Sequence, residues 1–156
     1  MNAAQQAFLD AYLATLSPRE CKAVPVCVAE HFCADEENAN ICAQLVNSGI
    51  KTATCSLKAA YDIEQQPLPA PGRLTVVLNW AQQPVCVIKT TTVSFCPFNR
   101  VPAAFAKAEG EGDGSYRWWY QAHLAFFNGH ARELGLAFTA DSELVLEHFE
   151  KVYPLE

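Results

Sequence analysis

The chain has 156 residues, of which 51% are hydrophobic and 18% charged, so it is long and apolar enough for one domain with its own core. A net charge of −6 weighs against extended, sequence-independent binding to nucleic acid, but not against a small pocket for one nucleoside. No apolar run could span a bilayer and no basic segment precedes one at the N-terminus, so we expect a cytoplasmic protein without a membrane partner.

The N-terminal third of the chain shows two helical segments. Apolar residues recur at helical spacing over residues 3–16, and Ser17-Pro18 ends that helix. We assign this helix to an N-terminal helical extension, about residues 1–30, of a single domain that covers residues 1–156. A second helix is expected to begin after Asp35, which can act as its N-cap, and to end at Gly49, a typical helix C′ residue.

The remainder of the chain is richer in strand patterns. Four strands are expected, over residues 52–58, 74–80, 85–93 and 144–153. Residues 81–84 form a hairpin turn between the second and third of these. A short helix is predicted over residues 102–108, and Ser115 can cap a longer helix that runs to about Asn128. Strand pairs mixed with peripheral helices predict an α+β domain around a small, mostly antiparallel sheet or barrel.

A polar run, Gly49-Ile50-Lys51-Thr52-Ala53-Thr54, follows the second helix. The helix dipole alone favours a lysine at a helix C-terminus, so an exposed Lys51 is the simpler interpretation. If Lys51 and Thr54 shared a pocket, a desolvated lysine with a lowered pKa could take the proton of the threonine hydroxyl. Strand alternation places the two side chains on opposite faces, so this hypothesis requires an irregular chain between them.

An acidic, glycine-rich segment precedes the long C-terminal helix. Glu109, Glu111 and Asp113 alternate with glycines there, and a solvated flexible loop is the simple interpretation. An EF-hand calcium loop is excluded, because the position of its bidentate glutamate holds Tyr120. Three neighbouring carboxylates repel one another unless a cation compensates, and Lys51 could supply that cation.

The seven cysteines are odd in number and no secretion signal accompanies them, so we expect free thiols. His31-Phe32-Cys33 comes nearest to a metal-ligand pair, but no second closely spaced pair completes a zinc site. We therefore predict small buried thiols, with no metal and no other cofactor. His130 is interpreted as a packed residue, whereas His123 is left open as a base, a ligand or a packed residue.

In this order and spacing, the segments from about residue 32 to residue 153 resemble the ASCH domain family of the PUA-like superfamily. The run from Gly49 to Thr54 resembles the family's Gly-x-Lys-Thr-x-Thr signature. A block of the longer bacterial members, Ala-Glu-Gly-Glu-Gly-Asp…Trp…His…Phe-Phe, is matched by residues 108–115, Trp119, His123 and Phe126-Phe127. The resemblance implies a small PUA-like mixed or antiparallel β-barrel flanked by helices, and an association with RNA.

Small ASCH-type amidohydrolases remove the acetyl group of N4-acetylcytidine with a lysine, a threonine and a glutamate. The resemblance implies Lys51, Thr54 and Glu111 as the catalytic residues here, with Glu109 as the fallback carboxylate. As substrate-binding residues we expect Thr52, Glu109, Asp113, Ser115, Trp119 and His123. Two departures bear on substrate contacts: the amidohydrolases lack Gly112-Asp113-Gly114, and the Phe-Gly-Asp of long members is replaced by Phe32-Cys33-Ala34-Asp35.

Three functions stay open at this point. The leading hypothesis is a metal-independent hydrolase that removes an acyl group from a modified pyrimidine nucleoside. The second is a ribonuclease, an activity reported for other ASCH proteins. The third is a non-catalytic RNA-binding or regulatory module, which predicts a basic surface stripe through Lys51, Lys58, Lys89 and Arg100. The acidic net charge favours a nucleoside ligand over a long RNA.

Overall fold

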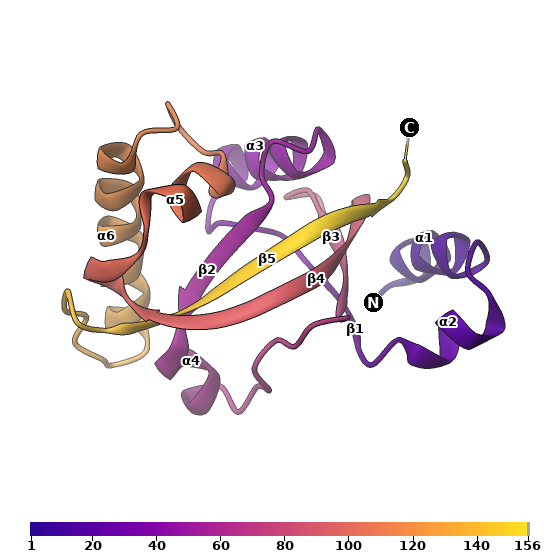
Figure 1. The fold of residues 1–156 in the computed structure, drawn as a ribbon, viewed down its shortest axis with the longest axis horizontal. Helices are drawn as coiled ribbons and strands as arrows, with labels where there is room; N and C mark the ends of the chain where they lie inside the picture. Colours follow the sequence, from indigo (N-terminus) through magenta and orange to yellow (C-terminus); the bar gives the residue numbers. More distant parts are fainter. Residues whose placement is uncertain (156) are drawn as a thin grey trace.

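A computed structural model describes residues 1–155 as an α+β domain built on one five-stranded sheet (Figure 1). The strand order is β1-β3-β4-β5-β2, in which β1 runs parallel to β3 and the other neighbours are antiparallel. The strands are β1 (Cys27–Glu30), β2 (Ala53–Leu57), β3 (Leu74–Leu78), β4 (Pro84–Pro97) and β5 (Glu143–Tyr153). The α+β class predicted from the sequence is thereby confirmed.

Six α-helices surround the sheet. They are α1 (Ala3–Leu13), α2 (Pro18–Ala23), α3 (Glu36–Asn47), α4 (Lys58–Ile63), α5 (Ala103–Glu109) and α6 (Tyr116–Glu133), with a short 3₁₀ helix, η1 (Phe98–Arg100), after β4. Figure 1 shows α1 and α2 together at one end of the sheet and α5 and α6 at the other. No helix of the described chain is both long and apolar enough to cross a membrane.

The two faces of β3 pack against different helices because its side chains alternate. Leu74, Val76 and Leu78 contact the apolar face of α1 through Leu9 and Tyr12. Val77 points to the other face, where it joins residues of α3. A third cluster under α5 and α6 centres on three fully buried aromatic residues, Phe98, Trp119 and Phe127. The sheet is therefore covered on both faces, and α3 and α6 carry the site described below.

The predicted barrel is wrong, because the sheet is open. Within residues 1–155, β1 pairs only with β3 and β2 pairs only with β5, so both remain edge strands. A barrel requires hydrogen bonds between its first and last strands. The N-terminal 30 residues form α1 and α2, where one helix over residues 3–16 was predicted, and their last four residues form β1 and join the sheet.

Candidate functional site

The end of α3 directs Lys51 into the protein. Gly49 adopts a φ of +80° after the last turn, and the backbone N–H groups of Ile50 and Lys51 both donate to the carbonyl of Leu45 at 3.0 Å. This is a Schellman-type helix end, for which glycine is favoured because its φ is positive. Because β2 begins only at Ala53, Lys51 lies in the turn, and strand alternation does not separate it from Thr54.

The polar run and the acidic segment meet through their backbones. Thr52 donates its N–H to the carbonyl of Ala108 at 2.8 Å, next to the end of α5. Gly110 caps α5 with a φ of +68°, and a Cβ there would lie 2.6 Å from the carbonyl oxygen of Ile50. The glycine therefore permits a close approach of two segments. This packing replaces the flexible loop that was the simple interpretation of the sequence.

Lys51 is buried between two carboxylates, with 2% of its side chain exposed. Its Nζ lies 2.8 Å from Oε2 of Glu111 and 3.6 Å from Oε1 of Glu109. Burial by itself lowers the pKa of Lys51, but the two carboxylates outweigh it and hold that pKa above its ordinary value. The structure therefore contradicts two predictions for Lys51, that its side chain is exposed and that its pKa is lowered. Lys51 is an ammonium ion in this arrangement.

Glu109 gathers donors from α6 and β2 and pairs with Lys51 in the turn before β2. It is 1% exposed and accepts hydrogen bonds from Trp119 Nε1 and, at 2.8 Å, from His123 Nε2. The thiol of Cys55 lies 3.8 Å away. Burial raises the pKa of Glu109, but Lys51 and His123 overcome this and hold that pKa below its usual value. Glu109 is therefore a buried carboxylate whose charge is fully compensated.

His123 is held in its charged form by two acceptors. Its Nδ1 lies 2.8 Å from the carbonyl oxygen of Trp119, and its Nε2 faces Glu109. Only an imidazolium can donate from both nitrogens at once. Burial lowers the pKa of His123, but the hydrogen bond and charge of Glu109 raise it above its ordinary value. The buried cluster thus alternates cations and anions, in the order His123, Glu109, Lys51, Glu111.

A pocket of about 220 Å³ opens onto this cluster. Lys51, Thr54, Glu109, Glu111 and His123 all line it. The remaining lining residues come from the segment before α3, from α3 itself, from β2 and from α6, and among them the sequence motifs include residues 32–35 and Phe126. These residues are Phe32, Cys33, Ala34, Asp35, Asn38, Cys42, Cys55, Trp118, Ala122 and Phe126.

Four of the predicted substrate-binding residues do not line this pocket. The hydroxyl of Thr52 donates to the carbonyl of Ala108 at 3.3 Å. Asp113 accepts the N–H of Ser115, and the Ser115 hydroxyl caps α6. Trp119 is buried in the core, where its indole N–H holds Glu109. Thr52 and Trp119 thus position the cluster, whereas Asp113 and Ser115 stabilise the start of α6.

Phe32 lies at the site, although the sequence assigned it no role of its own there. Its ring lies 5.5 Å from Lys51 Nζ, in a cation–π arrangement. With Trp118 and Phe126 it gives the pocket aromatic walls. Aromatic residues in distant segments carry no spacing signal, so the fold is needed to show that Phe32 and Phe126 share one pocket.

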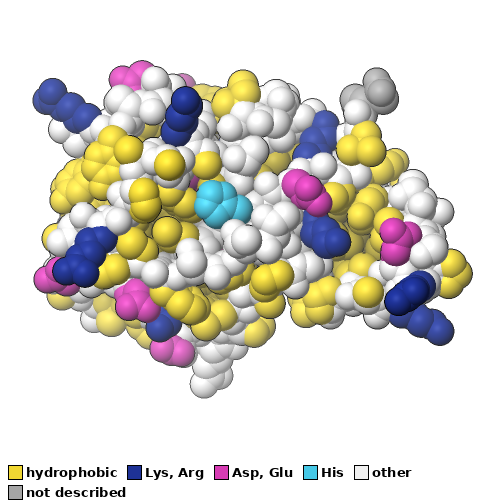
Figure 2. All heavy atoms as spheres, in the orientation of Figure 1, with side chains coloured by type: hydrophobic (Ala, Val, Ile, Leu, Met, Phe, Trp, Pro, Cys, Tyr) yellow, Lys and Arg dark blue, Asp and Glu magenta, His cyan; other side chains and the backbone are white. Residues whose placement is uncertain are grey.

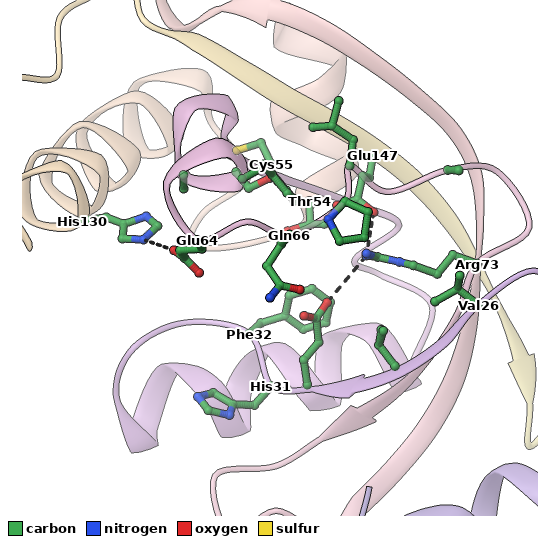
Figure 3. A pocket seen from close by; sticks show the side chains of 18 of the residues that line it. Val26, His31, Phe32, Thr54, Cys55, Glu64, Gln66, Arg73, His130 and Glu147 are labelled. Atoms are coloured by element: carbon green, nitrogen blue, oxygen red, sulfur yellow. Dashed lines mark hydrogen bonds and ion pairs between the residues drawn. The ribbon is translucent and has the colours of Figure 1, made fainter. Parts of the chain in front are cut away.

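A second cavity of about 450 Å³ adjoins the first (Figure 3). The two share five lining residues: Phe32, Cys33, Thr54, Cys55 and Phe126. Arg73 crosses the larger cavity and lies 3.2 Å from Glu147 and 3.8 Å from Glu30. Burial raises the pKa of Glu147 to about 7, although Arg73 opposes the shift. The larger cavity lies between the edge strands β1 and β2, both of which line it.

Comparison with known proteins agrees with this architecture. A family model described as ASCH domain matches residues 28–153. An ASCH domain structure from Lactobacillus crispatus is 45% identical, with a TM-score of 0.95, covering 99% of this chain and 97% of its own. A protein structure from Enterococcus faecalis is 32% identical, with a TM-score of 0.84 and coverages of 98% and 92%.

An ASCH protein from Zymomonas mobilis is 11% identical over 80% of this chain and 67% of its own, and its TM-score of 0.51 shows a shared fold alone. No curated protein matches the sequence. The family model and the two closer structures agree over most of the chain. The protein therefore belongs to the ASCH domain family.

Proposed function

We propose that the 220 Å³ pocket hydrolyses the amide of an acylated pyrimidine nucleoside of the N4-acetylcytidine type. The observation that carries this proposal is that Lys51, Thr54 and Glu111 all line one small pocket, where Lys51 and Glu111 form an ion pair. Its volume lies below the roughly 300–1,000 Å³ that is usual for drug-sized ligands. That size suits one acylated base better than an RNA strand.

Because its pKa is raised, Lys51 would not act as the base that the sequence suggested, and the roles of Lys51 and Glu111 change accordingly. Lys51 is an ammonium ion, so it would stabilise the oxyanion that develops on the acyl oxygen. Glu111 would be the base, because 16% of it is exposed and Lys51 donates to only one of its oxygens, Oε2. Glu109 is fully compensated by its donors and would hold Lys51 in place.

The proposed reaction has two balanced steps. First, Thr54 Oγ1 attacks the acyl carbon while its proton passes to Glu111, and the C–N bond breaks as the leaving amine takes that proton. Second, water attacks the acyl ester on Thr54 and Glu111 takes a proton of the water. The ester C–O bond then breaks, Glu111 returns that proton to Thr54 Oγ1, and the carboxylic acid leaves. Phe32, Trp118 or Phe126 would stack on the base, which contributes about 1–3 kcal/mol per base where it occurs.

The test is release of cytidine from N4-acetylcytidine by the purified protein. Thr54→Val and Glu111→Gln are each expected to lower kcat by a factor of at least about 100. Matched controls are Thr92→Val and Glu143→Gln, exposed residues away from the pocket, which should keep full activity. Absence of turnover in the wild-type protein, or full activity in both pocket variants, would refute the proposal.

One observation favours a ribonuclease as a second candidate. The larger cavity adjoins the pocket and contains Arg73, whose Nε is buried and has no hydrogen-bond partner within the described residues. An arginine beside the pocket could bind the phosphate of a neighbouring nucleotide. Cleavage of RNA that is lost with a 2′-deoxy substrate and in Arg73→Gln would support this function. RNA left intact by the wild-type protein would exclude it.

The non-catalytic RNA-binding module gains less support from the site. Lys51 is buried, so it cannot join a basic surface stripe. Figure 2 shows the Lys and Arg side chains of one face spread apart, with acidic side chains among them. Salt-sensitive RNA binding without turnover would nevertheless restore this alternative.

A further inference from the structure

Two thiols and one carboxylate converge at the rim of the 220 Å³ pocket. The Sγ atoms of Cys33 and Cys42 lie 3.3 Å apart, and Cys42 Sγ lies 3.6 Å from Oε1 of Glu111. All three potential ligand atoms lie within 4.8 Å of one another. They come from the segment before α3, from α3 itself and from the loop after α5, so no sequence spacing indicates the cluster.

We propose that Cys33, Cys42 and Glu111 bind a Zn²⁺ ion, with its fourth coordination position open to the pocket. Zinc favours four ligands in a tetrahedral arrangement, and thiolate, imidazole and carboxylate are its usual donors. Bond lengths of about 2.3 Å to sulfur and about 2.0 Å to oxygen place sulfur and oxygen about 3.5 Å apart and two sulfurs about 3.8 Å apart. The Cys42–Glu111 distance already fits, and the sulfurs need to separate by about half an ångström.

The charges around the triad are compatible with a divalent cation. Zinc binding releases a proton from each of the two thiols, so the +2 charge is balanced and Lys51 gains no new repulsion. Lys51 donates to Oε2 of Glu111 at 2.8 Å, so the other oxygen, Oε1, is the one that faces Cys42. A metal-binding carboxylate that is oriented by a second hydrogen bond is common in zinc sites.

The backbone supports a specific role for Cys33. Its φ is +67°, a conformation that residues other than glycine adopt only uncommonly. A strained residue of this kind persists when its surroundings impose it, and such residues concentrate at functional sites. Here the residue with this conformation is Cys33, whose sulfur contacts that of Cys42 at the pocket.

A neighbouring triad, Cys55, Glu109 and His123, has similar spacing but is unsuitable. His123 already donates to Glu109, and the indole of Trp119 donates to the same oxygen. A metal there would have to displace both donors and deprotonate the imidazolium. By contrast, Oε1 of Glu111 faces only the Cys42 thiol.

The test is zinc binding by the purified full-length protein under reducing conditions, without any substrate. Metal analysis of the dialysed wild-type protein should find about one zinc per chain. Co²⁺ in place of zinc should give the intense absorption of thiolate–cobalt bonds. Cys33→Ser, Cys42→Ser and Glu111→Gln should each weaken zinc binding by about 10–100-fold or more. Cys96→Ser, a cysteine outside the cluster, is the matched control and should retain zinc.

Two results would overturn the proposal. They are a reduced wild-type protein without zinc, and zinc that is retained when both Cys33 and Cys42 are serine. The proposal does not rest on the proposed hydrolase: Thr54→Val should abolish turnover but keep zinc. If both hold, zinc occupies the Glu111 oxygen that takes the proton, so the zinc form is the inactive form of the hydrolase. Turnover of the wild type and of its variants is therefore measured on protein from which a chelator has removed the zinc.

Discussion

Glu147 provides a sharp test of the electrostatics between the edge strands. It lies on β5 opposite Thr54, is 7% exposed and pairs with Arg73 at 3.2 Å. Burial raises its pKa to about 7 from the ordinary 4.5. Because the folded-state pKa is the higher one, this group's contribution to stability is complete below about pH 4.5 and is lost as the pH rises through about 7. At about 1.4 kcal/mol per pKa unit, the gap between 4.5 and about 7 corresponds to about 3 kcal/mol.

The perturbation is Glu147→Gln, which keeps the side-chain volume and an acceptor for Arg73 but cannot ionise. Urea denaturation of both proteins gives their free energies of unfolding from about pH 4 to about pH 8.5. The stability of the glutamine variant relative to the wild type should rise by about 3 kcal/mol across this range. Other titrating groups are common to both proteins and cancel in the difference.

Glu143→Gln is the matched control, because Glu143 lies on the same strand with 46% of its side chain exposed. Its difference from the wild type should change little with pH. A Glu147→Gln difference that stays within about 1 kcal/mol over the whole range, or that falls as the pH rises, would refute the reasoning.

The remaining predictions concern the cluster and its supporting loop. Lys51→Met should lower the free energy of unfolding by about 3–5 kcal/mol because it leaves buried carboxylates uncompensated; a loss below about 1 kcal/mol in urea denaturation would contradict this. Gly112→Ala should lower the free energy of unfolding by about 2–4 kcal/mol, since its Cβ would overlap the Trp118 ring. Gly114→Ala also has a positive φ but open space around it, and should lower that free energy by about 1–2 kcal/mol. Equal losses in the two variants would contradict the role of the Trp118 ring. The wild type should exceed His123→Gln in stability below about pH 6.5 and lose that advantage as the pH rises through the raised folded-state pKa of His123. If the His123 imidazole titrates below 6.5 in NMR spectra, the prediction for His123→Gln is contradicted.

Helix boundaries could be predicted where a cap residue marks them. Asp35 and Ser115 do cap α3 and α6, and Gly49 does end α3 with a positive φ. The four-residue strand β1 was missed, because a short edge strand carries too little alternation to be recognised. Whether the sheet closes also depends on the distance between two edges far apart in sequence, which no local pattern encodes.

The candidate site was predictable only in part. The motifs indicated Lys51, Thr54 and Glu111, and these do line one pocket. The direction of the Lys51 pKa was not predictable, since it depends on whether burial or two nearby carboxylates prevail. The cysteine cluster was also hidden, because the first half of α3 separates Cys33 from Cys42 and both meet Glu111 only through the fold.

The open sheet has a consequence for how much this scaffold can vary. Among the described residues no strand lies between β1 and β2, and this leaves the space that forms the larger cavity. Hydrogen-bonded strands lie only about 4.8 Å apart, so joining these two edges would eliminate the larger cavity and bury Arg73 without room for any ligand. Small shifts of either edge strand would change the size of that space without disturbing the central strands β3, β4 and β5. Members of such a fold could therefore acquire ligands of different size while the same core is kept.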